Sequence, residues 1–243
     1  RIFRNLQRMI EIAGGEDRLR PHVKTHKLPE IIGMHLSLGI TRFKCATIAE
    51  AEMVAGSGGQ DVLLAHQPVG PNAVRLRFLA DRYPKTKWAT VVDDIGMVQT
   101  LSDVFAGAES DLAVYLDLNC GMNRTGILPG PDARVIYEAI CNAPGLKAGG
   151  LHAYDGHNHE EDLEKRIAKC ESDFKPVAFS KLIDGVIHFR VRAVGASNDR
   201  GKFNQYISNN NPFIGFTVPT HVEIELAVLD RKLMKEVQNG LEQ

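Results

Sequence analysis

Strand-like and helix-like segments alternate along most of this 243-residue chain, and the alternation limits the folds open to it. Seven segments have the composition of short strands, at 19–25, 42–46, 61–65, 87–92, 112–118, 146–154 and 186–194. Segments with helical spacing of apolar residues precede and separate them, at 2–13, 29–38, 47–55, 71–83, 94–106, 131–142 and 160–174. Strands separated by helices in this way run parallel and are joined by helical crossovers.

The number of these units, with no break in composition, favours a closed α/β barrel of the (β/α)8 TIM type over an open sheet. A doubly wound sheet is the alternative, although its G-x-G-x-x-G fingerprint is absent after the first strand. In a barrel, chemistry gathers on the loops that follow the strands. The unusual polar residues of this chain lie at those places: Lys24, Thr47, His66, Gln67, Arg124 and the segment 152–157.

Composition points to one soluble domain with a sizeable core, because 44% of the residues are hydrophobic and the formal net charge is -1. This balance argues against nucleic acid or an anionic membrane as the main partner. The four cysteines form no close pair, which is typical of free thiols in a reducing compartment such as the cytoplasm. The chain opens with Arg1 inside a helical pattern, so we expect the natural protein to begin earlier and the barrel to be incomplete at its N-terminus.

Lys24 is predicted to stand where the first strand gives way to a helix that begins near Pro29. His22 and His26 flank it at even spacing, so on an extended segment all three side chains would share one face. A lysine placed at a strand end among proton-exchanging groups is suited to remain partly neutral, as an imine-forming lysine must. A solvated loop of lysines and histidines is the alternative interpretation, and these residues alone do not decide between the two.

Four motifs together resemble one known family: Arg20-Pro21-His22-Val23-Lys24-Thr25-His26-Lys27, Phe43-Lys44-Cys45-Ala46-Thr47-Ile48-Ala49-Glu50-Ala51-Glu52, Gly121-Met122-Asn123-Arg124-Thr125-Gly126 and Gly150-Leu151-His152-Ala153-Tyr154-Asp155-Gly156-His157. They are similar to segments of the D-threonine aldolase and D-serine dehydratase group. These are pyridoxal-phosphate enzymes whose barrel is related to the N-terminal domain of alanine racemase. The resemblance covers about residues 1–194, with the motifs in the expected order.

The resemblance implies that Lys24 binds pyridoxal phosphate as a Schiff base. Lys27 is the competing lysine, but it falls at the predicted start of a helix and is expected to point outward. Arg124 lies in a segment similar to Gly-Met-x-Arg-x-Gly of alanine racemases, where the arginine contacts the phenolic oxygen of the cofactor. His22 and Gln67 are further candidates for cofactor contacts.

His152 and Tyr154 have even spacing at a strand end, so both are expected to face the barrel mouth. There Tyr154 could contact the cofactor ring or its nitrogen, and His152 could support it as a catalytic residue. A packed aromatic residue at a strand end is the alternative for each. His157 and His159 have a spacing found among metal ligands, but without a third ligand we interpret them as solvated loop histidines.

The resemblance ends near residue 195. The family has a Gly-Gly-Ser/Thr-Pro-Thr phosphate loop and then a β-rich domain that supplies zinc ligands. This chain has Gly195-Ala196-Ser197-Asn198-Asp199, closer to non-catalytic pyridoxal-phosphate homeostasis proteins, where Gly195 and Ser197 could still hold a phosphate. Segment 221–239 is predicted to be one amphipathic helix, and neither zinc ligand is identified. We therefore predict a barrel domain over 1–195 and a diverged or truncated segment over 196–243, without the family's β-domain.

These observations predict a pyridoxal-phosphate-dependent lyase that acts on a small D-amino acid bearing a β-hydroxyl group, as an aldolase or a dehydratase. A non-catalytic pyridoxal-phosphate carrier and an amino-acid racemase are the alternatives. A homodimer is compatible with either class. Zinc belongs to the family pattern, but no metal ligand is assigned in this chain.

Overall fold

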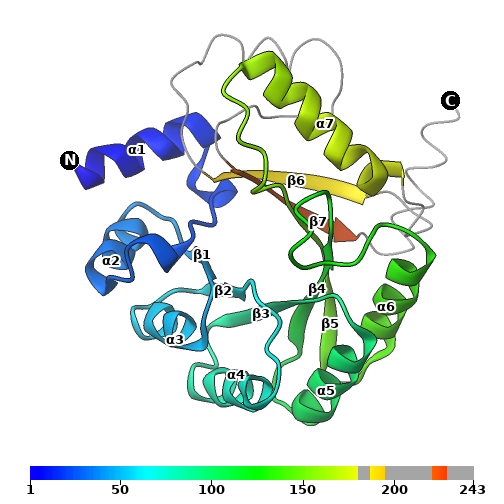
Figure 1. Cartoon of the computed structure of the whole chain (residues 1–243). Helices are drawn as coiled ribbons and strands as arrows, with labels where there is room; N and C mark the ends of the chain where they lie inside the picture. Colours follow the sequence, from blue (N-terminus) through cyan, green and yellow to red (C-terminus); the bar gives the residue numbers. More distant parts are fainter. Residues whose placement is uncertain (180–186, 195–220, 229–243) are drawn as a thin grey trace, which may run out of the picture.

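A computed structural model describes residues 1–179, 187–194 and 221–228 of the chain. Its centre is a curved sheet whose strand order is β1-β2-β3-β4-β5-β7-β6 (Figure 1). The strands are β1 Arg42–Cys45, β2 Asp61–Leu64, β3 Lys87–Val92, β4 Leu112–Leu118, β5 Leu146–Tyr154, β6 Ile187–Val194 and β7 His221–Val228. Strands β1 to β5 are parallel to their neighbours in sequence order, which confirms the predicted barrel class.

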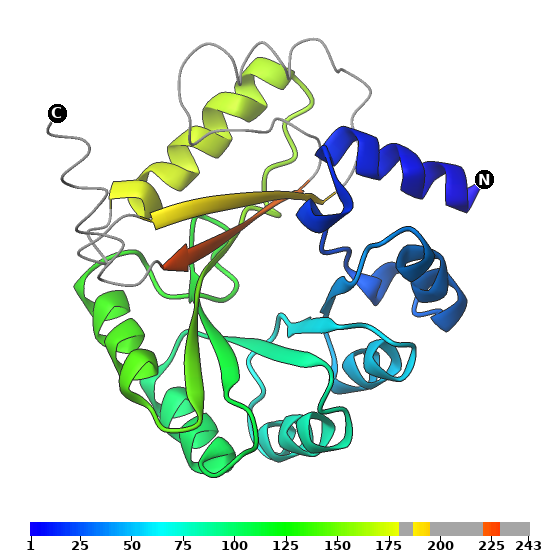
Figure 2. The same ribbon diagram turned by 180° about the vertical axis from the view of Figure 1, so that it is seen from behind.

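Helices follow the parallel strands and lie around the outside of the sheet (Figures 1 and 2). They are α1 Ile2–Ala13, α2 Pro29–Ser37, α3 Ile48–Gly56, α4 Pro71–Arg82, α5 Ile95–Phe105, α6 Pro131–Asn142 and α7 Leu163–Phe179. Their starts follow local chemistry: Thr47 and Asp94 accept backbone N–H groups at the first turns of α3 and α5. Within the described residues, none of these helices is both long and apolar enough to cross a membrane.

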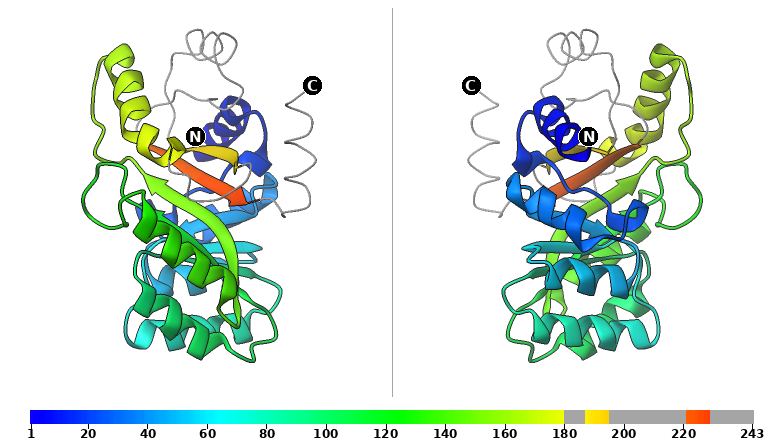
Figure 3. Two further views of the ribbon diagram at one scale, coloured as in Figure 1. Left: turned by 90° about the vertical axis from the view of Figure 1, so that its right-hand side faces the viewer. Right: turned by 90° about the vertical axis from the view of Figure 1, so that its left-hand side faces the viewer.

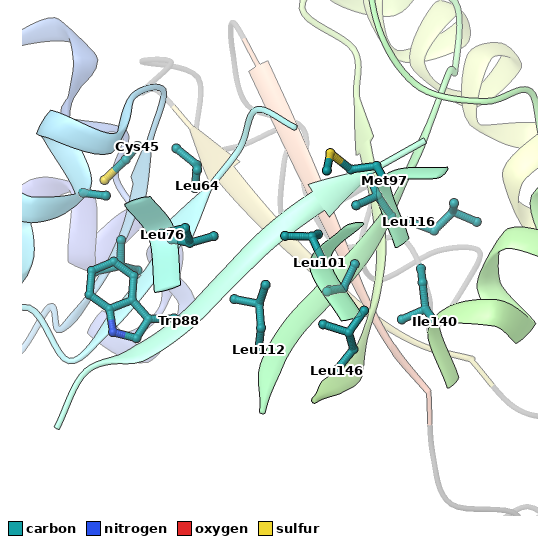
Figure 4. Packing of buried hydrophobic residues seen from close by; sticks show 14 of the residues in the cluster. Cys45, Leu64, Leu76, Trp88, Met97, Leu101, Leu112, Leu116, Ile140 and Leu146 are labelled. Carbon is teal, nitrogen blue, oxygen red and sulfur yellow. The ribbon is translucent and has the colours of Figure 1, made fainter. Parts of the chain in front are cut away.

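The main hydrophobic core lies between the sheet and the helices. Alternating residues of each strand point toward it; on β1 these are Phe43 and Cys45, which are fully buried. Leu76 of α4, Leu101 of α5 and Ile140 of α6 belong to the same core and are contributed by the helix layer (Figure 4). The apolar spacing seen in the sequence is therefore used to attach each helix to its strands.

The opposite face of the sheet is lined by fewer apolar side chains, Leu63, Ala89, Val91 and Tyr115, which form a separate small cluster. Toward the carboxyl ends of the strands this face becomes polar. Lys44 on β1, Asp117 on β4 and His152 on β5 alternate with residues of the main core, and all three are buried. The inner face of the sheet therefore has a small apolar cluster, with charged groups nearer the carboxyl ends of the strands.

The predicted strand at 19–25 is wrong in its second half. Only His22 makes a bridge to the sheet, beside Lys44, and residues Val23–Thr25 form the 3-10 helix η2. The His22 side chain accepts the backbone N–H of Lys24 at 3.2 Å, which turns the chain at this point instead of continuing the strand. Lys24 therefore sits on a turn at the edge of the sheet, and His22 and His26 do not share an extended face with it.

The predicted helix at 221–239 is also wrong where the structure describes it, because His221–Val228 forms strand β7. This strand pairs antiparallel with both β5 and β6, so the sheet is not parallel throughout. Both side views show β7 lying beside β5 (Figure 3). The alternation of Val222, Ile224 and Leu226 with polar residues has the two-residue period of a strand, which explains the pairing. Residues 229–239 lie outside the described part of the chain.

Candidate active site

Lys24 lies at the mouth of the sheet and is exposed. Its positive charge lowers the pKa of both His22 and Lys44, which places the amine in the electrostatic environment of the polar inner face. The pKa of His22 falls to about 3, first because the ring is buried and then because Lys44 and Lys24 are cationic. His22 is therefore neutral at physiological pH and serves as a hydrogen-bond acceptor at the start of η2.

Glu50 links the start of α3 to Lys27, just after the turn that carries Lys24. Its buried carboxylate accepts the Ala46 backbone N–H at 2.8 Å and lies 3.5 Å from the amine of Lys27. The Lys27 side chain is 62% exposed, in agreement with the prediction that it points outward. Lys27 also adopts a φ of 50°, the left-handed conformation that closes the turn before α2. Lys27, the alternative to Lys24 as the Schiff-base lysine, is thus paired with Glu50.

A buried chain of hydrogen-bonding groups crosses the inner face below the mouth. Lys44 Nζ lies 3.1 Å from His152 Nε2, and His152 Nδ1 lies 2.6 Å from Asp117 Oδ1. Because a carboxylate only accepts hydrogen bonds, His152 donates its Nδ1–H to Asp117 and presents Nε2 to the lysine. The three side chains come from β1, β5 and β4.

The pairing of β4 with β5 explains why Asp117 and His152 meet. The register shifts after Val114, and Gly149 is the extra residue on β5. A Cβ on Gly149 would lie 2.6 Å from the Tyr115 ring, so glycine lets this ring pack over the bulge. Beyond the bulge, Asp117 stands directly opposite His152.

Burial lowers the pKa of Lys44 to about 7. The charge of Asp117 opposes this effect, while the cations Lys24, Arg124 and Arg20 reinforce it. The inner face therefore collects positive charge around an amine that is partly neutral near pH 7. Such a concentration of cations suits a small ligand that carries several negative charges.

Tyr154 lies between two of these cations. Arg124 is 5.4 Å and Lys44 is 5.2 Å from the centre of its ring. Burial raises the pKa of the Tyr154 hydroxyl, Arg124 opposes the shift, and Asp155 adds to it. Tyr154 and His152 alternate on β5 with Leu151 and Ala153 of the main core, so they share the inner face. This is the placement that the even spacing predicted.

Arg124 lies on a loop whose conformation is held by hydrogen bonds within the loop. Asn119 accepts the backbone N–H groups of Gly121 and Asn123, and its amide donates to the Asn123 side chain at 2.9 Å. Asn123 has a φ of 53° and Gly126 a φ of 92°, so the loop needs residues that tolerate left-handed conformations. The motif Gly-Met-Asn-Arg-Thr-Gly, residues 121–126, forms this turn.

Gln67 joins neighbouring loops of the mouth. Its side-chain oxygen accepts the Asp93 backbone N–H at 2.9 Å, and the Asp93 carboxylate accepts the Gly126 N–H at 2.7 Å. The loops after β2, β3 and β4 are thereby tied together. The described contact of Gln67 supports the Arg124 loop, whereas its predicted contact with a cofactor stays a prediction.

His157 lies apart from this cluster. The His157 ring is 2.8 Å from Asp173 of α7, so it is not the solvated loop histidine that the sequence suggested. In the described part of the chain, no group of three or more His, Cys, Asp or Glu side chains is arranged to hold a metal. Gly195 and Ser197 lie outside the described residues.

Sequence reasoning missed Lys44 and Asp117. A signal was present, because both alternate along their strands with large apolar residues, and a charged side chain between two core positions must face the inside of the barrel. Lys44 follows Phe43 and precedes Cys45, and Asp117 lies between Leu116 and Leu118.

The fold and the cluster define a barrel domain with a lysine at the mouth, cationic side chains around it and an aromatic residue between them. The family model for the alanine racemase N-terminal domain matches residues 1–201, and the chain belongs to this family. It is 29% identical over 168 residues to a D-threonine aldolase of an Arthrobacter species, covering 68% of this chain and 44% of that protein. It is 32% identical over 177 residues to the 3-hydroxy-D-aspartate aldolase of Paracoccus denitrificans strain Pd 1222, covering 70% and 45%.

Among solved structures, the D-threonine aldolase from Filomicrobium marinum superposes with a TM-score of 0.68 at 33% identity, covering 74% of this chain and 48% of the other. The chain thus spans less than half the length of these relatives. The family implies pyridoxal phosphate as cofactor, and the residues present fit it. The cations Lys24, Lys44 and Arg124 suit its negative charges, and the Tyr154 ring, with the Arg124 guanidinium 5.4 Å from its centre, offers an aromatic surface beside them.

Proposed function

We propose that this chain is the cofactor-binding barrel of a pyridoxal-phosphate-dependent lyase for small D-amino acids that carry a β-hydroxyl group. The observation that supports this most is the convergence of Lys24, Lys44, Arg124 and Tyr154 at the carboxyl ends of the strands. The relatives are named for D-threonine and 3-hydroxy-D-aspartate, both of which carry a hydroxyl on the β-carbon. Bound pyridoxal phosphate would supply the electron sink for breaking a bond next to the amino group.

Each residue has a role suited to its place in this proposal. Lys24 is exposed on a turn held by His22, so it can reach a cofactor at the mouth and bind it covalently. Arg124, a permanent cation on a framed loop, would hold the negatively charged edge of the cofactor ring. Tyr154 would lie against the ring, with its neutral hydroxyl favoured by burial. His152 would orient neighbouring groups from below.

Reconstitution with pyridoxal phosphate tests this assignment. The purified 243-residue chain should develop a near-visible absorption band, and Lys24→Ala should abolish the band because its covalent partner is gone. Lys147→Met is the matched control, because this exposed lysine lies at the opposite end of β5 from His152. Borohydride reduction followed by peptide mapping should label Lys24 and not Lys27.

Substrate turnover then separates the alternatives. D-Threonine should yield glycine if the protein is an aldolase, and D-serine should yield pyruvate if it is a dehydratase; each is measured with and without added zinc. A stable band with no product would favour the carrier, and interconversion of D- and L-alanine would favour the racemase. Absence of any band in the unmodified protein would refute cofactor binding itself.

A further inference from the structure

Lys44, His152 and Asp117 form a buried unit to which the proposed function assigns no proton-transfer step. Their relative exposures are 6%, 6% and 6%, yet all three can carry charge. Two distances, 3.1 Å and 2.6 Å, link them in a line from β1 to β4. Burying three titratable side chains together costs free energy that an apolar inner face would avoid, which makes a purely structural role a poor explanation.

The order of the groups determines how a proton can move along them. Asp117 accepts the His152 Nδ1–H, so it stabilises the ring when a proton is added to Nε2. Nε2 faces Lys44 Nζ, and a proton can pass between these two nitrogens with little movement of heavy atoms. Lys44 Nζ also lies 5.2 Å from the centre of the Tyr154 ring, so the amine is next to the side chain that would lie against the cofactor.

We propose that Lys44 is a second catalytic amine, which accepts the hydroxyl proton of the substrate and shares it with His152, while Asp117 stabilises the resulting imidazolium. This inference rests on the proposed function. The substrate O–H bond breaks, its electron pair stays on oxygen, and the proton forms a new N–H bond on Nζ. Another N–H of Nζ then gives its proton to Nε2. Lys44 is the group that meets the substrate; His152 and Asp117 position it and hold the charge.

The charges around Lys44 come from every element packed against it. They are Asp117 on β4, His152 and Tyr154 on β5, Lys24 and His22 at η2, Arg20 before η2, and Arg124 on the loop after β4. Arg20 is already paired with Asp61, through contacts of 2.6 and 3.1 Å, so it acts on Lys44 from a fixed position. Among these groups, the Asp117 charge favours a protonated amine, whereas Lys24, Arg124 and Arg20 favour the neutral amine that can accept a proton.

The first test uses the cofactor-free protein and is independent of turnover. In lysine labelled with 13C and 15N, one side-chain signal should titrate with a midpoint near 7 and should disappear in Lys44→Met. Asp117→Asn should move this midpoint lower, because it removes a negative charge. Arg124→Met should move it higher, because it removes a positive charge. Lys147→Met should leave it unchanged, and a Lys44 signal with an ordinary midpoint would overturn the proposal.

The second test is the pH profile of the cofactor-loaded enzyme. With Lys44 as base, kcat should fall as the pH is lowered through about 7, because the amine becomes protonated. Lys44→Met should keep the absorption band of the cofactor but lose about 10²–10⁴-fold in kcat, together with this limb of the profile. Lys44→Arg keeps the charge but cannot release a proton near neutral pH, so it should be equally impaired.

The outcomes distinguish this inference from the function on which it rests. If Lys44→Arg restores activity, the lysine acts only through its charge and the proposal is wrong. If the cofactor binds and substrate is cleaved normally by Lys44→Met, the proposal is also wrong while the proposed function stands. If Lys44→Met loses its fold by circular dichroism, the Asp117→Asn and Arg124→Met titrations still decide the point, because they leave Lys44 in place.

Discussion

Lys44 makes the stability of the protein depend on pH. The amine has an ordinary pKa of 10.5 in the unfolded chain and about 7 in the folded one, so the unfolded state binds more protons between these values. The contribution of Lys44 to stability is therefore greatest above pH 10.5, falls as the pH is lowered from 10.5 to 7, and changes little below 7. The buried amine is therefore already destabilising at neutral pH, and further acidification adds little to this cost.

We predict that Lys44→Met changes this dependence. The free energy of unfolding of the unmodified protein, relative to the variant, should rise with pH by up to about 1.4 kcal/mol per unit between pH 7 and 10. Urea denaturation across that range measures the difference. Lys147→Met provides the comparison, because an exposed lysine should alter neither the level nor the slope. Parallel curves for the unmodified protein and Lys44→Met would contradict the lowered pKa.

The functional residues of the site can be identified from the sequence only where a recognisable motif surrounds them. Lys24, Arg124 and Tyr154 stand out because each lies at or beyond the end of a predicted strand and belongs to a recognisable segment. The partner of a side chain could not be predicted, because it depends on which strands are neighbours and on their register. Asp117 meets His152 only because a bulge shifts β5 by one residue.

Among the elements, the loop from Asn119 to Gly126 is the one whose backbone most limits its sequence. A Cβ on Gly126 would lie 2.7 Å from the backbone of both Leu118 and Asn119, and backbone atoms cannot move aside as a flexible side chain can. The Gly126 N–H also donates to Asp93, which holds this loop against the one after β3. The position of Arg124 therefore depends on a glycine two residues away.

We predict that Gly126→Ala lowers cofactor affinity at least tenfold and lowers the midpoint of thermal unfolding, since both the φ of 92° and the backbone contact oppose a Cβ. Gly107→Ala separates the two effects, because Gly107 has a φ of 77° but no atom near its Cβ position. Gly107→Ala should lower the free energy of unfolding by only about 1 kcal/mol and leave cofactor affinity unchanged. Spectrophotometric titration with pyridoxal phosphate measures affinity; equal behaviour of the two variants would disprove the packing argument.

The elements themselves are largely predictable, because β1 to β5 and helices α1 to α6 carry plain periodicities, and most of these helices begin at a capping residue or a proline. The two errors have local causes. At η2 a histidine side chain captures a backbone N–H and ends the strand early, which a periodicity does not reveal. At β7, apolar residues recur at every second position but merge into a longer stretch with helical spacing, and the shorter period is the one that 221–228 follows.

At the scale of the whole molecule, stability and chemistry are placed on opposite faces of one sheet. The outer face and the helices share the large core, in which Leu101 is fully buried. The inner face carries the charged side chains, and Arg124 reaches it from an exposed loop. Because strand residues alternate between these faces, the same short strands serve both purposes without sharing side chains.

This separation predicts that the two properties can be changed independently. Leu101→Ala should lower the free energy of unfolding by about 2–5 kcal/mol, because it leaves a cavity between α5 and the sheet, while cofactor affinity at 25 °C stays within twofold. Arg124→Met should do the reverse, weakening cofactor binding while shifting the thermal midpoint little, since the side chain is exposed. Thermal unfolding of the cofactor-free proteins and absorbance titration measure the two effects separately. If Leu101→Ala weakened binding as much as Arg124→Met, the inner face would have to move with the helix layer, and the charged groups at the mouth could not be a rigid, preformed site.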